Sequence, residues 1–163
     1  MMKMKTITVA FIASALAASS AAADGSKLDK KAILKQHDLT QANKALVLKA
    51  YQELFGDHDL TALDRYWTAN YIQHNPTMTD GRDSVRQLLE KMGITHWPKQ
   101  KVEFKRVIAE GDLVMTEVVQ PKTDATPETA IVDMFRVENG KIAEHWDVIQ
   151  AVPADAVNKR SMY

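Results

Sequence analysis

The stretch Thr129–Ala151, TAIVDMFRVENGKIAEHWDVIQA, decides the fold. Two runs rich in β-branched and aromatic residues lie on either side of Asn139-Gly140. Asn-Gly is the strongest short signal for a hairpin turn, because both residues tolerate a positive φ. The stretch therefore predicts two antiparallel strands that meet at this turn.

Titratable side chains fall on faces of these strands that are otherwise apolar. Successive side chains of a strand point to opposite faces. This alternation groups the following residues on one face of each strand: Ile131, Asp133, Phe135 and Val137 in the first, and Ala143, His145, Asp147 and Ile149 in the second. Ionisable groups among apolar neighbours are costly unless they are paired or serve a function. Asp133, His145 and Asp147 are therefore the first candidates for a functional site.

Upstream of the hairpin, the sequence predicts helices followed by strands. Helical or alternating spacing of apolar residues indicates helices at 41–55, 62–67 and 82–92, and strands at 71–76, 101–110 and 113–120. This order is typical of an α+β fold. We expect a strongly curved antiparallel sheet whose concave face is covered by about three N-terminal helices, which together form a cone. The open mouth of such a cone is the default place for a ligand pocket.

Residues 1–23 have the composition of a secretory signal peptide. A basic start precedes the apolar run 6–18, and Ala21-Ala22-Ala23 supplies the small residues of a cleavage site. We expect cleavage near Ala23 and a protein exported to the periplasm or secreted. A buried N-terminal helix is the alternative. The apolar run is too short to span a bilayer.

The rest of the chain is expected to form one domain. Residues 24–40 are polar and lysine-rich and predict a flexible or partly helical arm, residues 41–152 the domain, and residues 153–163 a tail. The chain has 21 basic and 21 acidic residues, so no basic stripe indicates a nucleic acid or an anionic membrane as partner. It has no cysteine, which excludes thiol chemistry and zinc sites of the cysteine type.

Three motifs resemble one protein family. YIQHNP at Tyr71–Pro76, DGRDSVRQLL at Asp80–Leu89 and FRVENGKIAEHWD at Phe135–Asp147 together look like the SnoaL-like polyketide cyclases of the NTF2-like superfamily. The resemblance covers residues 41–151 and implies the same cone. It also implies a cofactor-free enzyme in which an aspartate is the general acid/base. The fold hosts many unrelated functions, so the resemblance is less specific for the reaction.

The aspartate that matches the family's E-H-x-D segment is Asp147. In an apolar, poorly hydrated cavity the pKa of a carboxyl group rises, which makes the carboxylate a better proton acceptor near neutral pH. Asp147 is therefore expected to remove a proton next to a carbonyl group of a small apolar compound. The resulting enolate serves aldol-type cyclisation, lyase chemistry or isomerisation. The alternative is a hydrogen-bonded carboxylate that orients His145 or a turn.

Further candidates surround this base. His145 orients Asp147, donates to a developing oxyanion, or is a structural histidine. Asp133, where some family members have histidine, shares a proton with Asp147 or pairs with a basic residue. The expected substrate-binding residues are Trp67, Tyr71, Gln73, His74, Asn75 and Trp146. Asn75 alternatively caps the turn at Pro76, and the aromatic residues alternatively belong to the core.

No metal site is expected. His74, Asp133, His145 and Asp147 are metal-ligand types, but the sequence lacks a compact motif such as H-E-x-x-H. Two other functions remain open: a protein that binds an apolar metabolite without converting it, and an interaction domain. The resemblance implies a homodimer that pairs through an apolar patch on the sheets.

Overall fold

The computed structural model describes residues 29–124 and 126–163. The expected signal peptide, with its cleavage near Ala23, lies outside the described residues. The elements follow one another as α1 (Lys30–Tyr51), η1 (Gln52–Gly56), α2 (Ala62–Tyr66), β1 (Trp67–Gln73), α3 (Arg82–Lys91), η2 (Ile94–His96), β2 (Phe104–Glu110), β3 (Leu113–Gln120), β4 (Thr129–Glu138) and β5 (Lys141–Ala151). No helix in this part of the chain is long and apolar enough to span a membrane.

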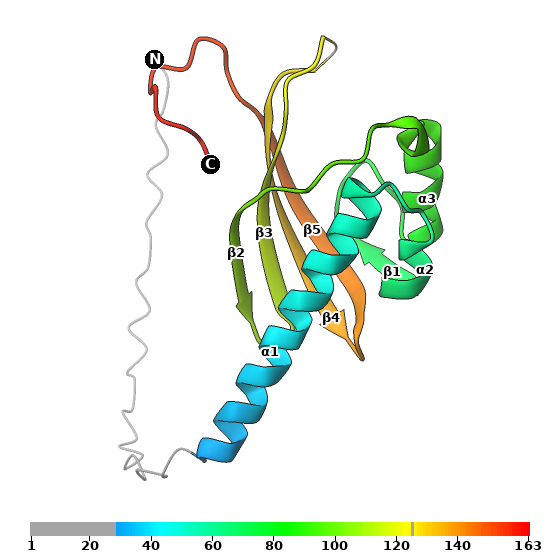
Figure 1. Ribbon diagram of the computed structural model, residues 1–163, viewed down its shortest axis with the longest axis vertical. Helices are drawn as coiled ribbons and strands as arrows, with labels where there is room; N and C mark the ends of the chain where they lie inside the picture. Colours follow the sequence, from blue (N-terminus) through cyan, green and yellow to red (C-terminus); the bar gives the residue numbers. More distant parts are fainter. Residues whose placement is uncertain (1–28, 125) are drawn as a thin grey trace, which may run out of the picture.

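The strands form one curved, open sheet in the order β1-β5-β4-β3-β2, and α1 crosses one of its faces (Figure 1). Strands β2 to β5 pair antiparallel with one another, whereas β1 pairs parallel with β5. The expectation of a purely antiparallel sheet is therefore wrong for β1. The pattern of a strand records which side chains point inward, but it does not record the direction of the strand beside it.

The first helix begins earlier than the sequence indicates. Asp29 is its N-cap, and the Asp29 carboxylate accepts the backbone N–H of Lys31 at 3.0 Å. The expected arm is therefore helical from Lys30 onward, and this first half of α1 extends past the end of the sheet (Figure 1). The second half of α1 packs on the concave face, where Val47 and Ala50 are fully buried.

The end of this helix is tied to the loop that precedes β2. From Gln52 to Gly56 the backbone forms a π-helical turn, a feature frequent at functional sites. The Gln52 amide oxygen accepts the backbone N–H of Val102 at 2.8 Å, and its Nε2 donates to the carbonyl oxygen of Gln100 at 3.0 Å. The loop is thereby held over the open end of the concave face.

Two shifts in strand pairing change which side chains point inward. The β2–β3 register shifts between Phe104 and Arg106, so Val107 and Ala109 pack against the core and Ile108 is exposed. Simple alternation through the 101–110 stretch would have placed Ile108 on the buried face. In β5, a bulge beside Val137 lets the consecutive residues Ile142 and Ala143 both be buried.

The short elements between α1 and α3 also differ from the prediction. The second helix ends at Tyr66, and the strand expected at 71–76 spans Trp67–Gln73 instead. Pro76 therefore lies in the turn after β1 rather than at the end of the strand. The turn between β4 and β5 is as expected, with positive φ at Asn139 (50°) and Gly140 (72°). The hairpin thus brings β4 and β5 side by side over their full length.

Candidate active site

A cavity of about 640 Å³ lies between the concave face of the sheet and the helices. Its volume is within the usual range for small-molecule sites. The wall is mainly apolar, with contributions from α1, β1, α3 and the inner faces of β3 to β5: among others Leu54, Trp67, Val85, Leu89, Val118 and Phe135. Polar side chains interrupt this wall. Those of β1 and the β4–β5 hairpin, Gln73, Asp133, His145 and Asp147, are buried or half-buried, whereas others such as Gln100, Lys101 and Gln120 are exposed.

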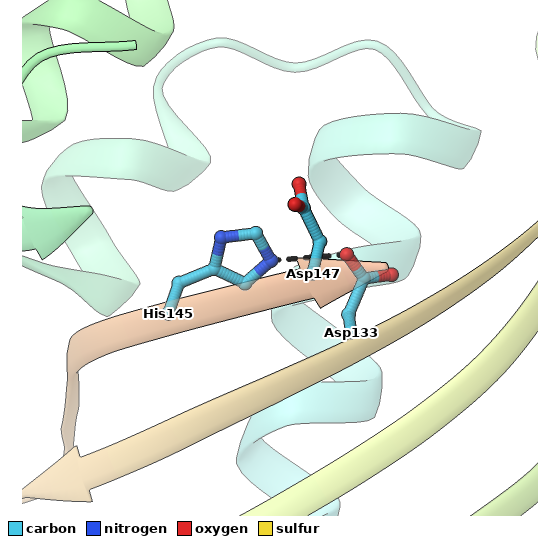
Figure 2. Close-up of side chains that lie close together, drawn as sticks. All are labelled: Asp133, His145 and Asp147. Carbon is cyan, nitrogen blue, oxygen red and sulfur yellow. Dashed lines mark hydrogen bonds and ion pairs between the residues drawn. The ribbon is translucent and has the colours of Figure 1, made fainter. Parts of the chain in front are cut away.

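The hairpin brings Asp133, His145 and Asp147 together. Asp133 and Asp147 are direct cross-strand partners, and His145 lies two residues before Asp147. All three line the cavity, and Figure 2 shows their side chains on one side of β4 and β5. Asp133 and His145 are buried, and Asp147 is half-buried. One ligand-type atom from each lies within 4.8 Å of the other two.

The imidazole of His145 bridges two acceptors. Its Nε2 lies 3.0 Å from Oδ1 of Asp133, and its Nδ1 lies 2.9 Å from Oε1 of Gln73. The same Gln73 oxygen accepts the backbone N–H of Asn75 at 2.9 Å, which assigns the amide oxygen to this position. Nδ1 must therefore donate, and Nε2 faces a carboxylate. This arrangement fits an imidazolium that donates one hydrogen bond from Nδ1 to Gln73 and a second from Nε2 to the Asp133 carboxylate.

The second oxygen of Asp133 is held by a residue that the sequence did not identify as part of the site. The Tyr51 hydroxyl of α1 donates to Oδ2 of Asp133 at 3.1 Å. Burial, followed by the charge of Asp133, raises the pKa of Tyr51, so its hydroxyl stays a donor. In the sequence, Tyr51 lies within the helix predicted at 41–55, and its spacing indicates only a place on the apolar face of that helix. One signal in the sequence could have identified Tyr51 as part of the site. It is a tyrosine on a helix face predicted to be buried, and a buried phenol usually has a hydrogen-bond partner.

Asp147 is held on one side only. Asn75 Nδ2 donates to Oδ2 of Asp147 at 2.6 Å, while Asn75 Oδ1 accepts the backbone N–H of Thr77 at 2.9 Å. Asn75 thus caps its own turn, the alternative role, and also reaches the site, although it does not line the cavity. No described residue forms a hydrogen bond or ion pair with Oδ1 of Asp147. This oxygen is therefore a free acceptor at the cavity.

The expected substrate-binding residues divide between the two faces of the sheet. Trp67, Tyr71 and Gln73 line the cavity. His74 and Trp146 do not: their rings stack on each other with centroids 4.7 Å apart, and His74 Nε2 lies 2.8 Å from Glu144. The structure therefore does not place these two predicted substrate-binding residues at the cavity. Each follows a cavity residue directly along its strand, so its side chain points to the opposite face.

The stacked residues His74 and Trp146 lie next to an ionic cluster on that opposite face. Arg136 Nε donates to Oε2 of Glu144 at 2.7 Å. Hydrogen bonds from Arg136, and then from His74, lower the pKa of Glu144. The His74 side chain thus has structural partners on the outer face, and only its backbone N–H reaches the candidate site, where it donates to the carbonyl oxygen of His145 at 3.0 Å.

Asp133, His145 and Asp147 are also the one group of metal-ligand types that lie close together among the described residues. Both nitrogens of His145 and both oxygens of Asp133 already have hydrogen-bond partners. A divalent ion would therefore have to displace the proton between His145 and Asp133. The hydrogen-bonding groups of His145 and Asp133 are thus satisfied by protein partners.

Comparisons with known proteins agree on the fold. Residues 48–145 match the SnoaL-like domain family. AclR from Streptomyces galilaeus, provisionally assigned as a hydroxylase, is 23% identical with a TM-score of 0.55, over 70% of this chain and 82% of AclR. An LEH-like epoxide hydrolase from M. tuberculosis is 19% identical with a TM-score of 0.54, over 68% of this chain and 84% of the hydrolase. A search of curated proteins finds no match.

A third structure extends this likeness. A protein of Kribbella flavida, provisionally assigned as a ketosteroid isomerase, is 13% identical with a TM-score of 0.56, over 76% of this chain and 89% of that protein. At such identities the likeness concerns the fold, and it confirms the expected NTF2-like cone. The family match spans more than half of the sequence, and the chain therefore belongs to the SnoaL-like domain family.

Proposed function

We propose that the cavity is the active site of a cofactor-free enzyme in which Asp147 is the general base toward a small apolar carbonyl compound. The fold supports membership of a family of small-molecule enzymes. The observation that carries the proposal is the position of Asp147 Oδ1. It is a carboxylate oxygen at a mainly apolar cavity, without a protein partner among the described residues, while Oδ2 is fixed by Asn75.

The proposed chemistry begins with the transfer of one proton. The Asp147 carboxylate takes a proton from the carbon next to the carbonyl group, and the electron pair of that C–H bond moves toward the carbonyl oxygen to give an enolate. Protonated Asp147 then returns the proton to another carbon in an isomerisation. Alternatively, the enolate carbon attacks the carbon of a second carbonyl group in an aldol-type cyclisation. The electron pair of that C=O bond moves to its oxygen, which takes the proton from Asp147, and a lyase reaction follows the same steps in reverse.

His145 acts as a fixed charge in this scheme rather than as a donor to substrate. Both of its N–H groups are committed to Gln73 and Asp133. Its positive charge nevertheless lies beside the cavity and favours the negative charge that develops on the enolate. Asp133, in turn, holds the imidazolium in place and is itself held by Tyr51.

A proton-exchange experiment tests the proposal. 2-Tetralone is an apolar ketone with readily exchangeable protons next to its carbonyl group. In D₂O, the wild-type protein should accelerate the loss of these protons, followed by proton NMR. Asp147→Asn should abolish the acceleration. Asp112→Asn, at an exposed turn, should preserve it. Full acceleration by Asp147→Asn would remove the proposed role of Asp147.

The alternative is a protein that binds a ligand in the same cavity without converting it. The volume and apolar wall of the cavity favour binding whether or not a reaction follows. Native mass spectrometry after incubation with 2-tetralone distinguishes the two functions. A bound ketone that retains all its exchangeable protons in D₂O would favour the binding protein.

We also propose that the protein is exported. The basic residues Lys3 and Lys5, the apolar run and the small residues up to Ala23 support this proposal. The intact mass of the protein recovered from a periplasmic or culture fraction should correspond to a chain that begins at Asp24. A mass that includes residues 1–23 would contradict cleavage.

A further inference from the structure

Most polar groups at the cavity are already satisfied by the protein. The nitrogens of His145 and the oxygens of Asp133 have partners, and the Asn75 amide is committed to Asp147 and Thr77. Two groups remain near Asp133, His145 and Asp147 among the described residues. One is the acceptor Oδ1 of Asp147, and the other is the hydroxyl proton of Tyr71. Other polar groups of the cavity wall without a full set of partners, on Gln100, Lys101, Gln120 and Glu128, belong to the loop before β2 and to the segments at the end of β3 and before β4.

The Tyr71 oxygen receives hydrogen bonds but gives none to the protein. Gln73 Nε2 donates to it at 3.4 Å, and the indole of Trp67 also forms a hydrogen bond with it. Amide and indole N–H groups only donate, so neither accepts the phenolic proton. No other described group accepts it. Because the Tyr71 side chain lines the cavity, the proton is available to a ligand there.

The hydroxyl keeps this proton under ordinary conditions. Burial is the largest cause that raises the pKa of Tyr71, and the charges of Asp133 and Asp147 raise it further. The Tyr71 ring stacks on the imidazole of His145 with centroids 6.3 Å apart, and Gln73 forms hydrogen bonds with both side chains, so the phenol lies in the same part of the cavity as the proposed base. Tyr71 is therefore a neutral hydrogen-bond donor beside the proposed base.

We propose that Tyr71 is a catalytic residue that donates a hydrogen bond to the carbonyl oxygen of the substrate while Asp147 takes the proton from the neighbouring carbon. This inference rests on the proposed function. As the C–H bond breaks, negative charge grows on the carbonyl oxygen, and the hydrogen bond from Tyr71 strengthens. Tyr71 keeps its proton throughout, so the proton balance involves only substrate and Asp147.

The same geometry restricts the substrate to a neutral ketone or aldehyde. A substrate carboxylate placed beside Tyr71 would face the negative charges of Asp133 and Asp147. The positive charge of His145 offsets only one of these two charges, so the three groups together stay negative until Asp147 takes a proton. A neutral carbonyl group acquires negative charge only during the reaction, when the Asp147 carboxylate has become neutral.

An equilibrium experiment isolates the donor role from turnover. In Asp147→Asn, an amide replaces the protonated form of the base. Ionised 2-naphthol carries an oxygen anion on a bicyclic apolar frame and thus resembles the enolate of 2-tetralone. Its dissociation constant is measured in mildly alkaline buffer for Asp147→Asn and for Asp147→Asn with Tyr71→Phe. Loss of a hydrogen bond to a charged oxygen should weaken binding about tenfold to a hundredfold.

Naphthalene, which has no oxygen, is the matched probe and should bind both variants equally. Equal affinities for ionised 2-naphthol, with naphthalene bound equally, would overturn the proposal. Tyr66→Phe is the matched substitution, because Tyr66 does not line the cavity and donates to Glu53. It should leave the affinity for 2-naphthol unchanged.

A second measurement covers the case in which the double variant fails to bind naphthalene. The carbonyl stretch of 2-tetralone bound to Asp147→Asn should lie at lower frequency than in an apolar solvent, because a hydrogen bond weakens the C=O bond. A frequency equal to that in the apolar solvent would overturn the proposal.

Failure of the proposed function has a different signature. If the wild type does not exchange the protons of 2-tetralone, but Tyr71→Phe weakens binding of ionised 2-naphthol, the donor role stands and the reaction does not. If exchange occurs, Tyr71→Phe should slow it about tenfold or more, with the larger effect on kcat. Exchange at the wild-type rate in Tyr71→Phe would overturn the catalytic role.

Discussion

The Tyr51 hydroxyl is the one hydrogen-bond donor to Oδ2 of Asp133 among the described residues. Tyr51→Phe leaves this buried carboxylate oxygen without a partner. We therefore expect the free energy of unfolding to fall by about 1–3 kcal/mol, the usual cost of an unsatisfied buried polar group. Urea unfolding followed by circular dichroism measures the change.

Tyr66→Phe is the control for that prediction. Tyr66 also donates to a carboxylate, but Glu53 is less buried and keeps its ion pair with Arg65 at 2.6 Å. Loss of the Tyr66 hydroxyl should lower the free energy of unfolding by less than about 1 kcal/mol. Equal losses for the two tyrosines would contradict the role assigned to Tyr51.

Tyr51 and Tyr71 also link stability to alkaline pH. Burial raises the pKa of both hydroxyl groups above their ordinary value of 10.0. Below pH 10 both the folded and the unfolded chain hold these protons, and the stabilisation is complete. As the pH rises above 10, only the unfolded chain loses them. Each tyrosine therefore lowers stability by about 1.4 kcal/mol per pH unit until its raised pKa is reached.

Tyr71→Phe separates one of these contributions from the other titrating groups. Urea unfolding of the wild type and of Tyr71→Phe, repeated at increasing pH above 10, should give a steeper decline for the wild type. Parallel declines would show that the Tyr71 hydroxyl ionises as readily in the folded chain as in the unfolded one.

At the level of elements, Gly56 joins the end of η1 to the loop before β2. Its carbonyl oxygen accepts the backbone N–H of Gln100 at 2.9 Å, and a Cβ at Gly56 would meet the carbonyl oxygen of Gln100 at 2.6 Å. Gly56→Ala must therefore displace this loop, which lines the cavity. We expect a loss of about 1–3 kcal/mol in the free energy of unfolding. Naphthalene affinity should also weaken, as measured by titration calorimetry.

Gly140→Ala is the control for this element. A Cβ at Gly140 meets no atom within 4 Å, but the φ of 72° disfavours alanine. This variant should lose stability through backbone strain at the hairpin tip while its cavity still binds naphthalene as the wild type does. Unchanged naphthalene affinity in Gly56→Ala would contradict the coupling between the helix end and the cavity.

At the level of the whole molecule, the outer face of the sheet carries an apolar row. The register places four side chains directly beside one another across β2 to β5: Ile108, Met115, Met134 and Trp146. Val148, next to this row on β5, is 67% exposed. Exposed apolar rows of this kind are typical of subunit interfaces. We therefore expect the homodimer implied by the resemblance to pair through this row.

Light scattering tests that arrangement. The wild type should have the mass of a dimer, and Met134→Lys should have the mass of a monomer, because a buried unpaired ammonium group in the interface is costly. Val157→Lys is the control, since Val157 is 99% exposed and lies outside the row. A monomeric wild type at working concentration would contradict the predicted dimer.

Local patterns in the sequence were sufficient for the fold class, for the hairpin and for the inward position of Asp133, His145 and Asp147. Side-chain alternation and the Asn-Gly turn depend only on neighbouring residues, so they can be read along the chain. The same alternation implied that Trp146 points away from His145. The inclusion of Trp146 in the cavity therefore conflicted with the pattern itself.

Only the tertiary structure decided which groups satisfy one another. Tyr51 and Asp133 are 82 residues apart in sequence, and Gln73 and His145 are 72 apart. The parallel pairing of β1 with β5 and the register shift near Phe104 likewise arise from contacts between distant segments. Such contacts form only when the sheet curves around α1, because their energy depends on packing between segments and not on any period within one segment.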